Sequence, residues 1–298
     1  YELVGGRGAS HQVAIKNHVS RQVWDNRYER FVNDSEERAL ELKHELDQAL
    51  LGQLKKAVND HRVEFAIANL ASLDYVGHQH GVRGGIEAYR RTVEKADAHF
   101  GEFLKFLDEG DFYDEYTVFI VADHGFTHIK NTDNVVAGGS RDEPDIPELG
   151  EAGIEHAVMS RGGSAFSLFI RNSSDVPEAY ELIRDKEWVQ KIYSEHDLPD
   201  LDGTMSGINY HIPPRSGDFF IDVASTHTVG FSSLGQHGSS QNRDRVIPHI
   251  FYGSGIAAGA SLKETENVDI APTVLALFGL DYRDHLEADG RVLTEIFK

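Results

Sequence analysis

Residues 117–128 of the chain read TVFIVADHGFTH, and the fold prediction starts from this stretch. Residues 118–122 are five apolar residues in a row, which predicts a strand buried on both faces, as in a parallel sheet. The strand runs into Asp123, His124 and Gly125. Open α/β sheets bind ligands beyond the carboxyl ends of their strands, so a carboxylate and an imidazole here indicate a site. Taken alone, these side chains are better explained as a solvent-facing cap of the next helix.

A second stretch repeats this arrangement. Residues 63–70, VEFAIANL, predict another buried strand, and residues 71–81, ASLDYVGHQHG, predict a glycine-bearing loop after it. In that loop Asp74 and His78 stand four residues apart, close enough to chelate one ion. Amphipathic helices are predicted at 33–61 and 86–107. Helix, strand and ligand-bearing loop thus occur twice in a row, which predicts an α/β fold with a doubly wound, mostly parallel sheet and helices on both faces.

The rest of the chain contains no repeat, low-complexity segment or linker, so a single domain is predicted over residues 1–298. A third His-Gly pair follows in GQHG at 235–238. The other predicted segments are an irregular excursion at 131–153, strands at 164–170, 217–224 and 246–252, helices at 176–189 and 270–278, and a loop or small subdomain at about 194–216.

The composition excludes several kinds of site and partner. The chain has no cysteine, so disulfides and thiolate metal sites are excluded, and any metal must be held by histidine and carboxylate. Its net charge of −20 argues against a general nucleic-acid binder, which needs Lys and Arg to contact phosphates. No apolar run approaches the length of a membrane span. A soluble, cytoplasmic protein is favoured, with any export signal preceding Tyr1, because a chain that opens on Tyr is processed or is part of a longer one.

Five candidate ligands stand just beyond predicted strands: Asp74, His78, Asp123, His124 and His237. Carboxylates and imidazoles in this mixture suit Zn²⁺ or Mn²⁺. Two such ions can hold both the attacking and the leaving oxygen of a phosphoryl transfer, and they lower the pKa of a nucleophile or a bound water. The pattern therefore predicts metal-dependent phosphoryl chemistry.

Several of these runs resemble one known family in the same order along the chain. LDYVGHQHG at 73–81 is similar to the D-x-x-G-H-x-x-G element of the alkaline phosphatase superfamily, in its type I phosphodiesterase/nucleotide pyrophosphatase branch. VADHGF at 121–126 resembles that family's second metal element, and GQHG followed by RVIPHIFYGSGI resembles its third. NVDIAPTVLALFGL and DGRVLTEIF are similar to its C-terminal helix and tail, so the resemblance covers the chain from about residue 63 to the end.

The resemblance implies an alkaline phosphatase-like α/β fold and a two-zinc site. Asp74, His78 and His237 would hold one zinc, and Asp123 and His124 would hold the other. It also implies a phosphoester hydrolase of the phosphodiesterase or nucleotide pyrophosphatase type that forms a covalent phospho-enzyme. The expected substrate is a small phosphate ester or a nucleotide-like molecule.

The first 34 residues depart from the family pattern. In the family, the second ion is completed by an Asp at the end of the first strand and by a Thr or Ser nucleophile, and YELVGGRGAS at 1–10 offers neither element. The glycine-rich loop at 5–10 fits neither dinucleotide-binding nor P-loop spacing, and Ser10 follows no matching strand. We therefore expect that the N-terminal part of the domain is missing, with the nucleophile upstream of Tyr1. One zinc should then bind well and a second poorly, with slow or absent turnover.

Four further residues are candidates for a supporting or substrate-contacting role: His80, His128, His156 and Arg243. His80 and His128 stand beside predicted ligands and would tune or line the site. A loop histidine such as His156 needs no function, and Arg243 in an acidic protein is better explained by salt bridges than by phosphate binding.

Two alternatives to a phosphodiesterase stay open on the sequence. The same metal motifs occur in phosphonate hydrolases, sulfatases and phosphomutases of the superfamily. A non-catalytic, metal-binding homologue is equally compatible with the missing nucleophile and first-strand Asp.

Overall fold

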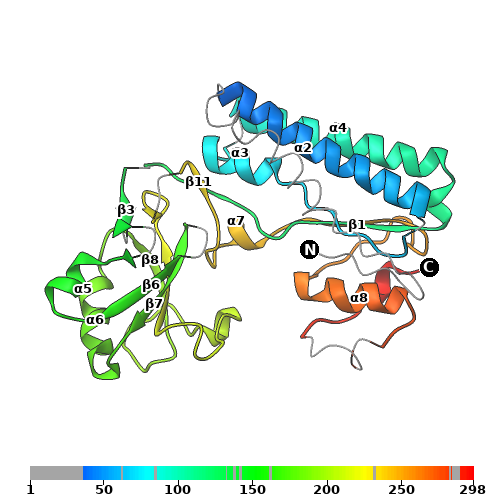
Figure 1. The fold of residues 1–298 in the computed structure, drawn as a ribbon. Helices are drawn as coiled ribbons and strands as arrows, with labels where there is room; N and C mark the ends of the chain where they lie inside the picture. The colour runs from blue at the N-terminus through cyan, green and yellow to red at the C-terminus, as the bar shows by residue number, and fades with distance from the viewer. Residues whose placement is uncertain are drawn as a thin grey trace. The chain divides into compact units, whose positions relative to one another are not determined.

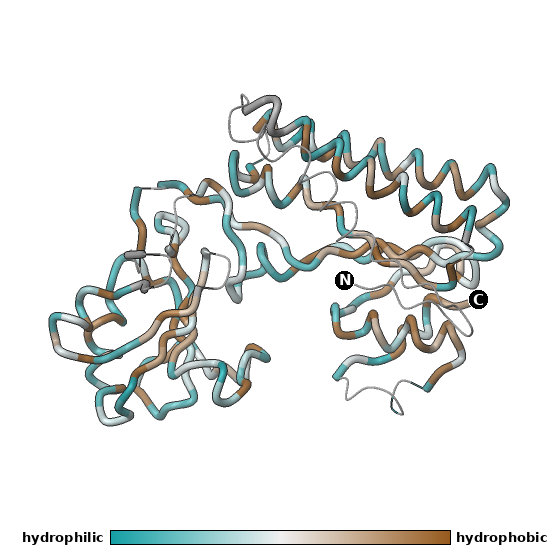
Figure 2. Tube along the Cα trace, viewed as in Figure 1, coloured by the Kyte–Doolittle hydropathy of each residue, from teal (hydrophilic) through white to brown (hydrophobic). Residues whose placement is uncertain are grey.

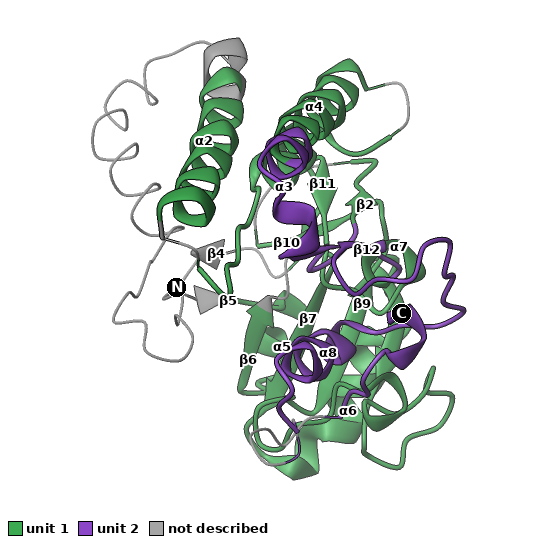
Figure 3. Cartoon of the chain, turned by 90° about the vertical axis from the view of Figure 1, so that its right-hand side faces the viewer, with its two compact units in different colours: residues 1–103, 126–245 green, residues 104–125, 246–298 purple. Residues whose placement is uncertain are grey.

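The computed structural model describes residues 36–61, 63–83, 86–131, 133–136, 139–140, 143–160, 163–230, 233–281, 283 and 289–298. The glycine-rich loop at 5–10, Ser10 and the predicted departure from the family pattern fall outside these residues. The chain divides into two compact units, which Figure 3 colours separately. Unit 1 comprises residues 1–103 and 126–245, and unit 2 comprises residues 104–125 and 246–298.

Unit 1 opens with the helices that the periodicity predicts. These are α2 (Glu36–Lys56), which continues as the π-helical turn η1 (Ala57–His61), and α4 (Glu87–Glu109), whose residues 104–109 belong to unit 2. In both long helices apolar and polar residues alternate along the tube in Figure 2, as amphipathic helices require. Leu42, Leu50 and Leu51 form the buried side of α2. Both helix predictions are confirmed.

The strand predicted at 63–70 is absent from the structure. These residues have no regular secondary structure and form no ladder with any residue that the structure describes. Phe65 and Leu70 pack against the buried cluster of Leu50 and Ala57, whereas Ile67 is 62 % exposed. An apolar run predicts burial, but a strand also needs a neighbouring strand to receive its hydrogen bonds, and the run cannot specify that neighbour.

The main sheet of unit 1 has four strands in the order β6-β7-β9-β8, and every neighbouring pair is antiparallel. Its strands are β6 (His156–Ser160), β7 (Ala165–Ile170), β8 (Val189–Tyr193) and β9 (Phe219–Val223). One face packs on α5 (Pro147–Glu151) and α6 (Val176–Ile183), which lie on that side in Figure 1. The opposite face is covered by Met205 and by Tyr210, whose ring lies 4.3 Å from that of Phe220.

The segment predicted as a loop or small subdomain at about 194–216 therefore covers the second face of this sheet. The structure gives it one short helical turn, η4 (Ser206–Ile208). The helix predicted at 176–189 ends at Ile183, and Val189 is already the first residue of β8. The excursion predicted at 131–153 contains α5 and the short strands β3 (Val135–Val136), β4 (Gly139–Ser140) and β5 (Glu143–Pro144).

Three two-stranded ladders complete the described pairing of unit 1. They join β2 (Thr127–His128) to β11 (Gly235–Gln236), β3 to β10 (Thr228–Val229), and β4 to β5. In the first, antiparallel ladder His128 lies opposite Gly235. This ladder places the residues that directly follow DHGF (123–126) beside the GQHG motif at 235–238.

Unit 2 is built around the antiparallel ladder of β1 (Thr117–Val121) and β12 (His249–Gly253). The rings of Phe119 and Phe251 meet edge to face across this ladder, 4.8 Å apart. Its other elements among the described residues are η2 (Phe112–Asp114), η5 (Asn267–Asp269), α8 (Ile270–Leu277) and η7 (Thr294–Ile296). The strand at 117–121 is thus confirmed, but it is only partly buried, and Val121 is 42 % exposed.

The α/β class is confirmed, with helices and sheets in one chain. Among the described ladders only β3–β10 runs parallel, whereas the sequence predicted mostly parallel pairing. Burial patterns report which faces are covered, and strand direction depends on the connections, which they do not encode. Among the described residues no helix is long and apolar enough to cross a membrane.

Candidate metal centre

Asp74 and His78 lie on α3 (Ser72–His80), a helix where the sequence predicted a loop. Their spacing of four residues places both side chains on one face of the helix. The glycines of ASLDYVGHQHG suggested a loop, but Gly77 is inside the helix for a packing reason. A side chain at Gly77 would begin 3.0 Å from the ring of Phe126. Gly81 follows the last residue of the helix with a positive φ of 76°, which favours glycine.

The N-terminus of α3 is held by a buried carboxylate from α2. Asp47 is 4 % exposed, and its oxygens accept hydrogen bonds from the backbone N–H groups of Ala71 and Ser72, at 3.0 and 3.3 Å. These are among the N–H groups that a helix cannot satisfy by itself, and a negative charge is favourable there. Burial raises the pKa of the Asp47 carboxyl. Asp47 thereby links α2 to the helix that carries two predicted ligands.

The ring of His78 is oriented by the strand next to it. Its Nδ1 donates to the carbonyl oxygen of Gly235 at 2.7 Å, and the hydroxyl of Ser233 donates to the backbone oxygen of His78 at 2.7 Å. With its proton on Nδ1, the imidazole presents the Nε2 lone pair on the other side. A metal-binding histidine is commonly oriented by such a backbone carbonyl.

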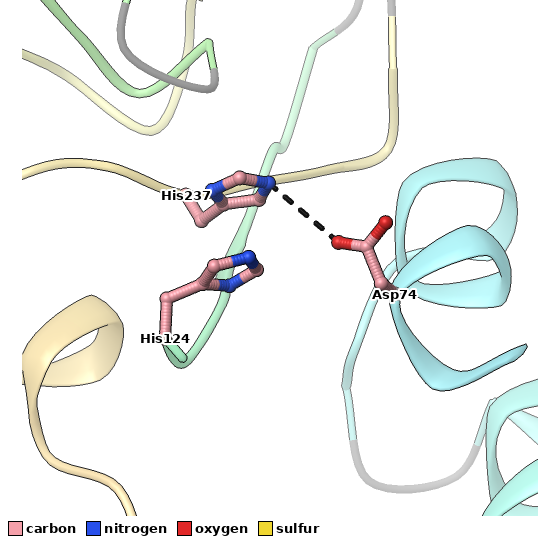
Figure 4. A group of neighbouring side chains, drawn as sticks. All are labelled: Asp74, His124 and His237. Carbon is pink, nitrogen blue, oxygen red and sulfur yellow. Dashed lines mark ion pairs between the residues drawn. The ribbon is translucent and has the colours of Figure 1, made fainter. Parts of the chain in front are cut away.

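His237 follows β11 and brings the third donor atom to the same point. Its Nε2 lies 3.2 Å from Nε2 of His78 and 3.6 Å from Oδ1 of Asp74. Oδ1 of Asp74 lies 3.5 Å from Nε2 of His78. Figure 4 shows the side chains of Asp74 and His237 facing each other, with the dashed line marking their ion pair. All three residues belong to unit 1.

These distances fit a metal ion. A tetrahedral zinc with bonds of about 2.0–2.1 Å separates its nitrogen and oxygen ligands by about 3.3–3.4 Å. The three donor atoms of unit 1 are 3.2, 3.5 and 3.6 Å apart. Two imidazole nitrogens and one carboxylate oxygen form a donor set that zinc accepts, and three protein ligands leave one coordination position open.

An aromatic ring supports the two histidines. The ring centroid of Phe126 lies 5.1 Å from that of His78 and 5.2 Å from that of His237, edge on in both cases. The side chains of the two histidines are 23 % and 20 % exposed, against 47 % for Asp74. The histidines are therefore largely shielded from water, and the donor atom Oδ1 of the half-exposed Asp74 is buried as well.

Asp123 and His124, the other two predicted ligands, lie in unit 2 directly after β1. Oδ1 of Asp123 accepts the backbone N–H of His124 at 3.2 Å, and Nδ1 of His124 lies 2.9 Å from the carbonyl oxygen of Gly125. The strand end is held by Asn267, whose side-chain amide donates to the carbonyl oxygen of Ala122 at 2.9 Å. The side chain of Asp123 is 73 % exposed.

His80 and His128 both lie in unit 1, near the end of α3. His80 is the last residue of α3. The ring of His128 packs onto Gly81, where an added Cβ would lie 2.3 Å from Nδ1 of His128. Burial, and to a lesser extent Arg83, lower the pKa of His128. His128 thus packs against the end of the helix that carries Asp74 and His78.

His156 has a structural role, and Arg243 lies on the surface. Nε2 of His156 accepts the backbone N–H of Ile146 at 3.1 Å, and its Nδ1 lies 3.0 Å from the carbonyl oxygen of Ile154. These bonds attach β6 to the turn before α5 and use both ring nitrogens. Arg243 lies exposed on α7 (Asn242–Arg245).

The sequence analysis missed Asp47, Phe126, Ser233 and Asp244, whose side chains contact α3, the two histidines or a segment beside them. For one of these residues, Asp47, the sequence contained a signal. Asp47 falls among the leucines of α2, and an acidic residue at a core position needs a partner. Asp244 is 3 % exposed and accepts hydrogen bonds from Thr127, Ser164 and Ser239, which are far apart in the sequence and give no local signal.

Comparison with known proteins finds curated relatives that are named alkaline phosphatases and one that is named an ATPase. Among these relatives, the chain is 28 % identical over 254 residues to the alkaline phosphatase PhoV of Synechococcus elongatus, which covers 79 % of this chain and 45 % of that protein. It is 27 % identical over 274 residues to the alkaline phosphatase PafA of Elizabethkingia meningoseptica, covering 80 % and 46 %. A calcium-transporting ATPase of Myroides odoratus is 27 % identical over 266 residues, covering 80 % and 47 %. The chain thus spans about half the length of these relatives.

Solved structures show the same fold. Wild-type PafA has a TM-score of 0.60 at 22 % identity, covering 86 % of this chain and 53 % of that one. Murine ectonucleotide pyrophosphatase/phosphodiesterase 5, solved with AMP, has a TM-score of 0.62 at 12 % identity, covering 85 % and 64 %. The model of one family, type I phosphodiesterase/nucleotide pyrophosphatase, matches residues 8–241, most of the chain. The chain therefore belongs to the type I phosphodiesterase/nucleotide pyrophosphatase family.

Proposed function

We propose that Asp74, His78 and His237 bind one zinc ion and that the protein hydrolyses phosphate esters of the phosphodiester or nucleotide type. The observation that carries the proposal is the convergence of three donor atoms, 3.2 to 3.6 Å apart, from two segments more than 150 residues apart in the sequence. Family membership supports the reaction class. Asp123 and His124 would contribute to a second ion, as the resemblance of VADHGF to the family's second metal element suggests.

Each residue of the centre has a separate part in this proposal. His78 keeps its proton on Nδ1 against the Gly235 carbonyl, so its Nε2 is available as a neutral ligand. His237 contributes the second neutral nitrogen, and the Asp74 carboxylate offsets part of the cation's charge. Zinc, when bound, supplies a Lewis acid for the phosphoryl oxygens. A phosphate ester would bind beside Asp74, the most exposed of the three side chains.

The first experiment measures zinc per chain by elemental analysis on protein purified without chelators. We expect about one tightly held zinc in the parent and far less in His78→Ala and His237→Ala, because each variant loses one of three ligands. His211→Ala is the matched control, since His211 lies in the segment that covers the far face of the sheet, 3.9 Å from Glu195. Equal zinc in the parent and both ligand variants would contradict the assignment.

The second experiment compares zinc-dependent hydrolysis of bis-p-nitrophenyl phosphate, p-nitrophenyl phosphate and p-nitrophenyl sulfate. Preference for the diester would support the phosphodiesterase assignment. Preference for the monoester would favour an alkaline phosphatase, which the names of PhoV and PafA make the second candidate. Preference for the sulfate would indicate a sulfatase. Full zinc occupancy without hydrolysis of any ester would indicate a non-catalytic metal-binding homologue.

A further inference from the structure

The backbone around His237 is held from both sides by serines. The carbonyl oxygen of His237 accepts the backbone N–H of Ser164 at 3.2 Å, and Gly163 forms an isolated bridge with His237. Two residues further on, Ser239 is 5 % exposed and begins the turn into α7. The position of the imidazole therefore depends on what holds Ser164 and Ser239.

One buried carboxylate holds both of them. Oδ2 of Asp244 accepts the hydroxyl of Ser164 at 2.7 Å, and the backbone N–H and hydroxyl of Ser239 at 2.9 and 2.6 Å. The other oxygen, Oδ1, accepts the hydroxyl of Thr127 at 2.8 Å. Hydrogen bonds to a charged acceptor are shorter and stronger than neutral ones, and four of them satisfy this buried charge.

These partners belong to the segments that surround the two metal-binding histidines. Ser164 and Ser239 bracket His237, and Thr127 is the neighbour of Phe126, whose ring lies against both His78 and His237. In the described part of the chain, no hydrogen bond of Asp244 goes to Asp74, His78 or His237. Its oxygens accept hydrogen bonds from three hydroxyls and one backbone N–H.

We propose that Asp244 is a positioning residue of the metal centre, which sets the place of the His237 imidazole by fixing Ser164 and Ser239. The proposal rests on the assignment of His237 as a metal ligand. Residues of this kind, one step removed from the ligands, typically change metal affinity by about 10- to 100-fold when they are removed.

A comparison of two substitutions separates hydrogen bonding from charge. Asp244→Asn can place its amide oxygen where Oδ2 now accepts Ser164 and Ser239, while its NH₂ group donates to the Thr127 hydroxyl. Asp244→Ala removes every acceptor. If Asp244 acts by positioning, Asp244→Ala weakens zinc binding at least about tenfold, and Asp244→Asn stays close to the parent. If its negative charge were what attracts the cation, both variants would weaken binding equally.

The test measures the zinc dissociation constant by competition with a chromophoric chelator, together with the free energy of unfolding of the metal-free proteins in urea. Ser239→Ala is the milder variant in case Asp244→Ala does not fold, and we expect it to weaken zinc binding less than Asp244→Ala does. Asp218→Ala is the control, because Asp218 also accepts a backbone N–H, that of Ile170 at 2.7 Å, but does not bond to Ser164 or Ser239. It should lower stability and leave zinc affinity unchanged.

The outcomes distinguish this inference from the proposed function. If His78→Ala and His237→Ala abolish zinc binding while Asp244→Ala and Ser239→Ala do not weaken it, the positioning role is wrong and the metal centre stands. Equal weakening by Asp244→Asn and Asp244→Ala also overturns positioning by hydrogen bonds. If neither histidine variant changes zinc binding, the metal centre itself is wrong.

Discussion

Gly235 shows how much of the centre depends on the absence of a single side chain. A Cβ at this position would lie 2.1 Å from the carbonyl oxygen of Gly77 and 2.8 Å from its carbonyl carbon. The backbones of β11 and α3 can approach this closely because residue 235 is glycine. The same approach brings the carbonyl oxygen of Gly235 within 2.7 Å of Nδ1 of His78.

We expect Gly235→Ala to lower the free energy of unfolding by about 1–3 kcal/mol, because the new methyl group must push backbone atoms apart. Zinc affinity should fall as well, since His78 loses its orienting carbonyl. Gly52→Ala is the matched control: Gly52 lies in α2 with nothing within 4 Å of an added Cβ. It should raise stability by up to about 1 kcal/mol, as helical Gly-to-Ala changes do. Urea unfolding checks both, and a Gly235→Ala variant as stable as the parent would contradict the close approach.

At the scale of elements, α2 connects the centre to the rest of unit 1 through two buried polar residues. Asp47 holds the start of α3, and His44, which is 4 % exposed, places its Nε2 3.5 Å from the hydroxyl of Thr92 on α4. Burial, and to a lesser extent the neighbouring charges of Lys95 and His99, lower the pKa of His44 to about 4, while Glu41 acts in the opposite direction. His44 is therefore neutral in the folded protein at pH 7.

This pKa predicts a loss of stability in acid. The folded-state pKa of about 4 is below the ordinary value of 6.5. Between these two pH values His44 is therefore protonated in the unfolded chain and neutral in the folded one. Stability is full above about pH 6.5 and falls as the pH drops toward 4, by up to about 1.4 kcal/mol per pH unit. We expect His44→Gln, which cannot titrate, to show a flatter profile.

Urea unfolding between about pH 7 and pH 5, with chelator present to exclude metal-ligand protonation, measures this difference. Asp47 contributes in the opposite direction, since burial raises its pKa, but it is present in parent and variant alike. Parallel pH profiles for the two proteins would show that His44 does not titrate as the burial requires.

At the scale of the whole molecule, the two compact units are interleaved along the chain. Unit 2 consists of residues 104–125 and 246–298, and unit 1 takes up the residues before and between them. The chain therefore passes from one unit to the other after residues 103, 125 and 245. Neither unit is a single continuous stretch, so the folding of each constrains the chain of the other.

We expect one cooperative unfolding transition, in keeping with the single domain that the sequence predicts. In calorimetry the metal-free protein should give one peak whose calorimetric and van't Hoff enthalpies agree. Zinc at about 100 times its dissociation constant should stabilise the whole protein by about 2.7 kcal/mol and shift this peak as a unit. Two transitions, of which zinc shifts only one, would show that the units unfold independently.

Local sequence information was sufficient where an element's stability comes from its own residues. The apolar periodicity predicted α2 and α4, and the runs at 118–122, 164–170 and 217–224 predicted the strands observed as β1, β7 and β9. The motif residues Asp74, His78 and His237 were selected by residue type and by resemblance to a family. Donor chemistry and helical periodicity are properties of the residues themselves, so one sequence is enough to reveal them.

Only the tertiary structure decided what depends on a distant partner. It made 72–80 a helix, because Asp47 caps the segment and the Phe126 ring accommodates Gly77 but no larger residue. It left 63–70 without a ladder, and it paired β1 with β12 in the antiparallel direction. It also joined Ser164 and Ser239 through Asp244. Buried hydrogen bonds and close backbone contacts join residues far apart in the chain, and no local pattern of side chains encodes which distant group will complete them.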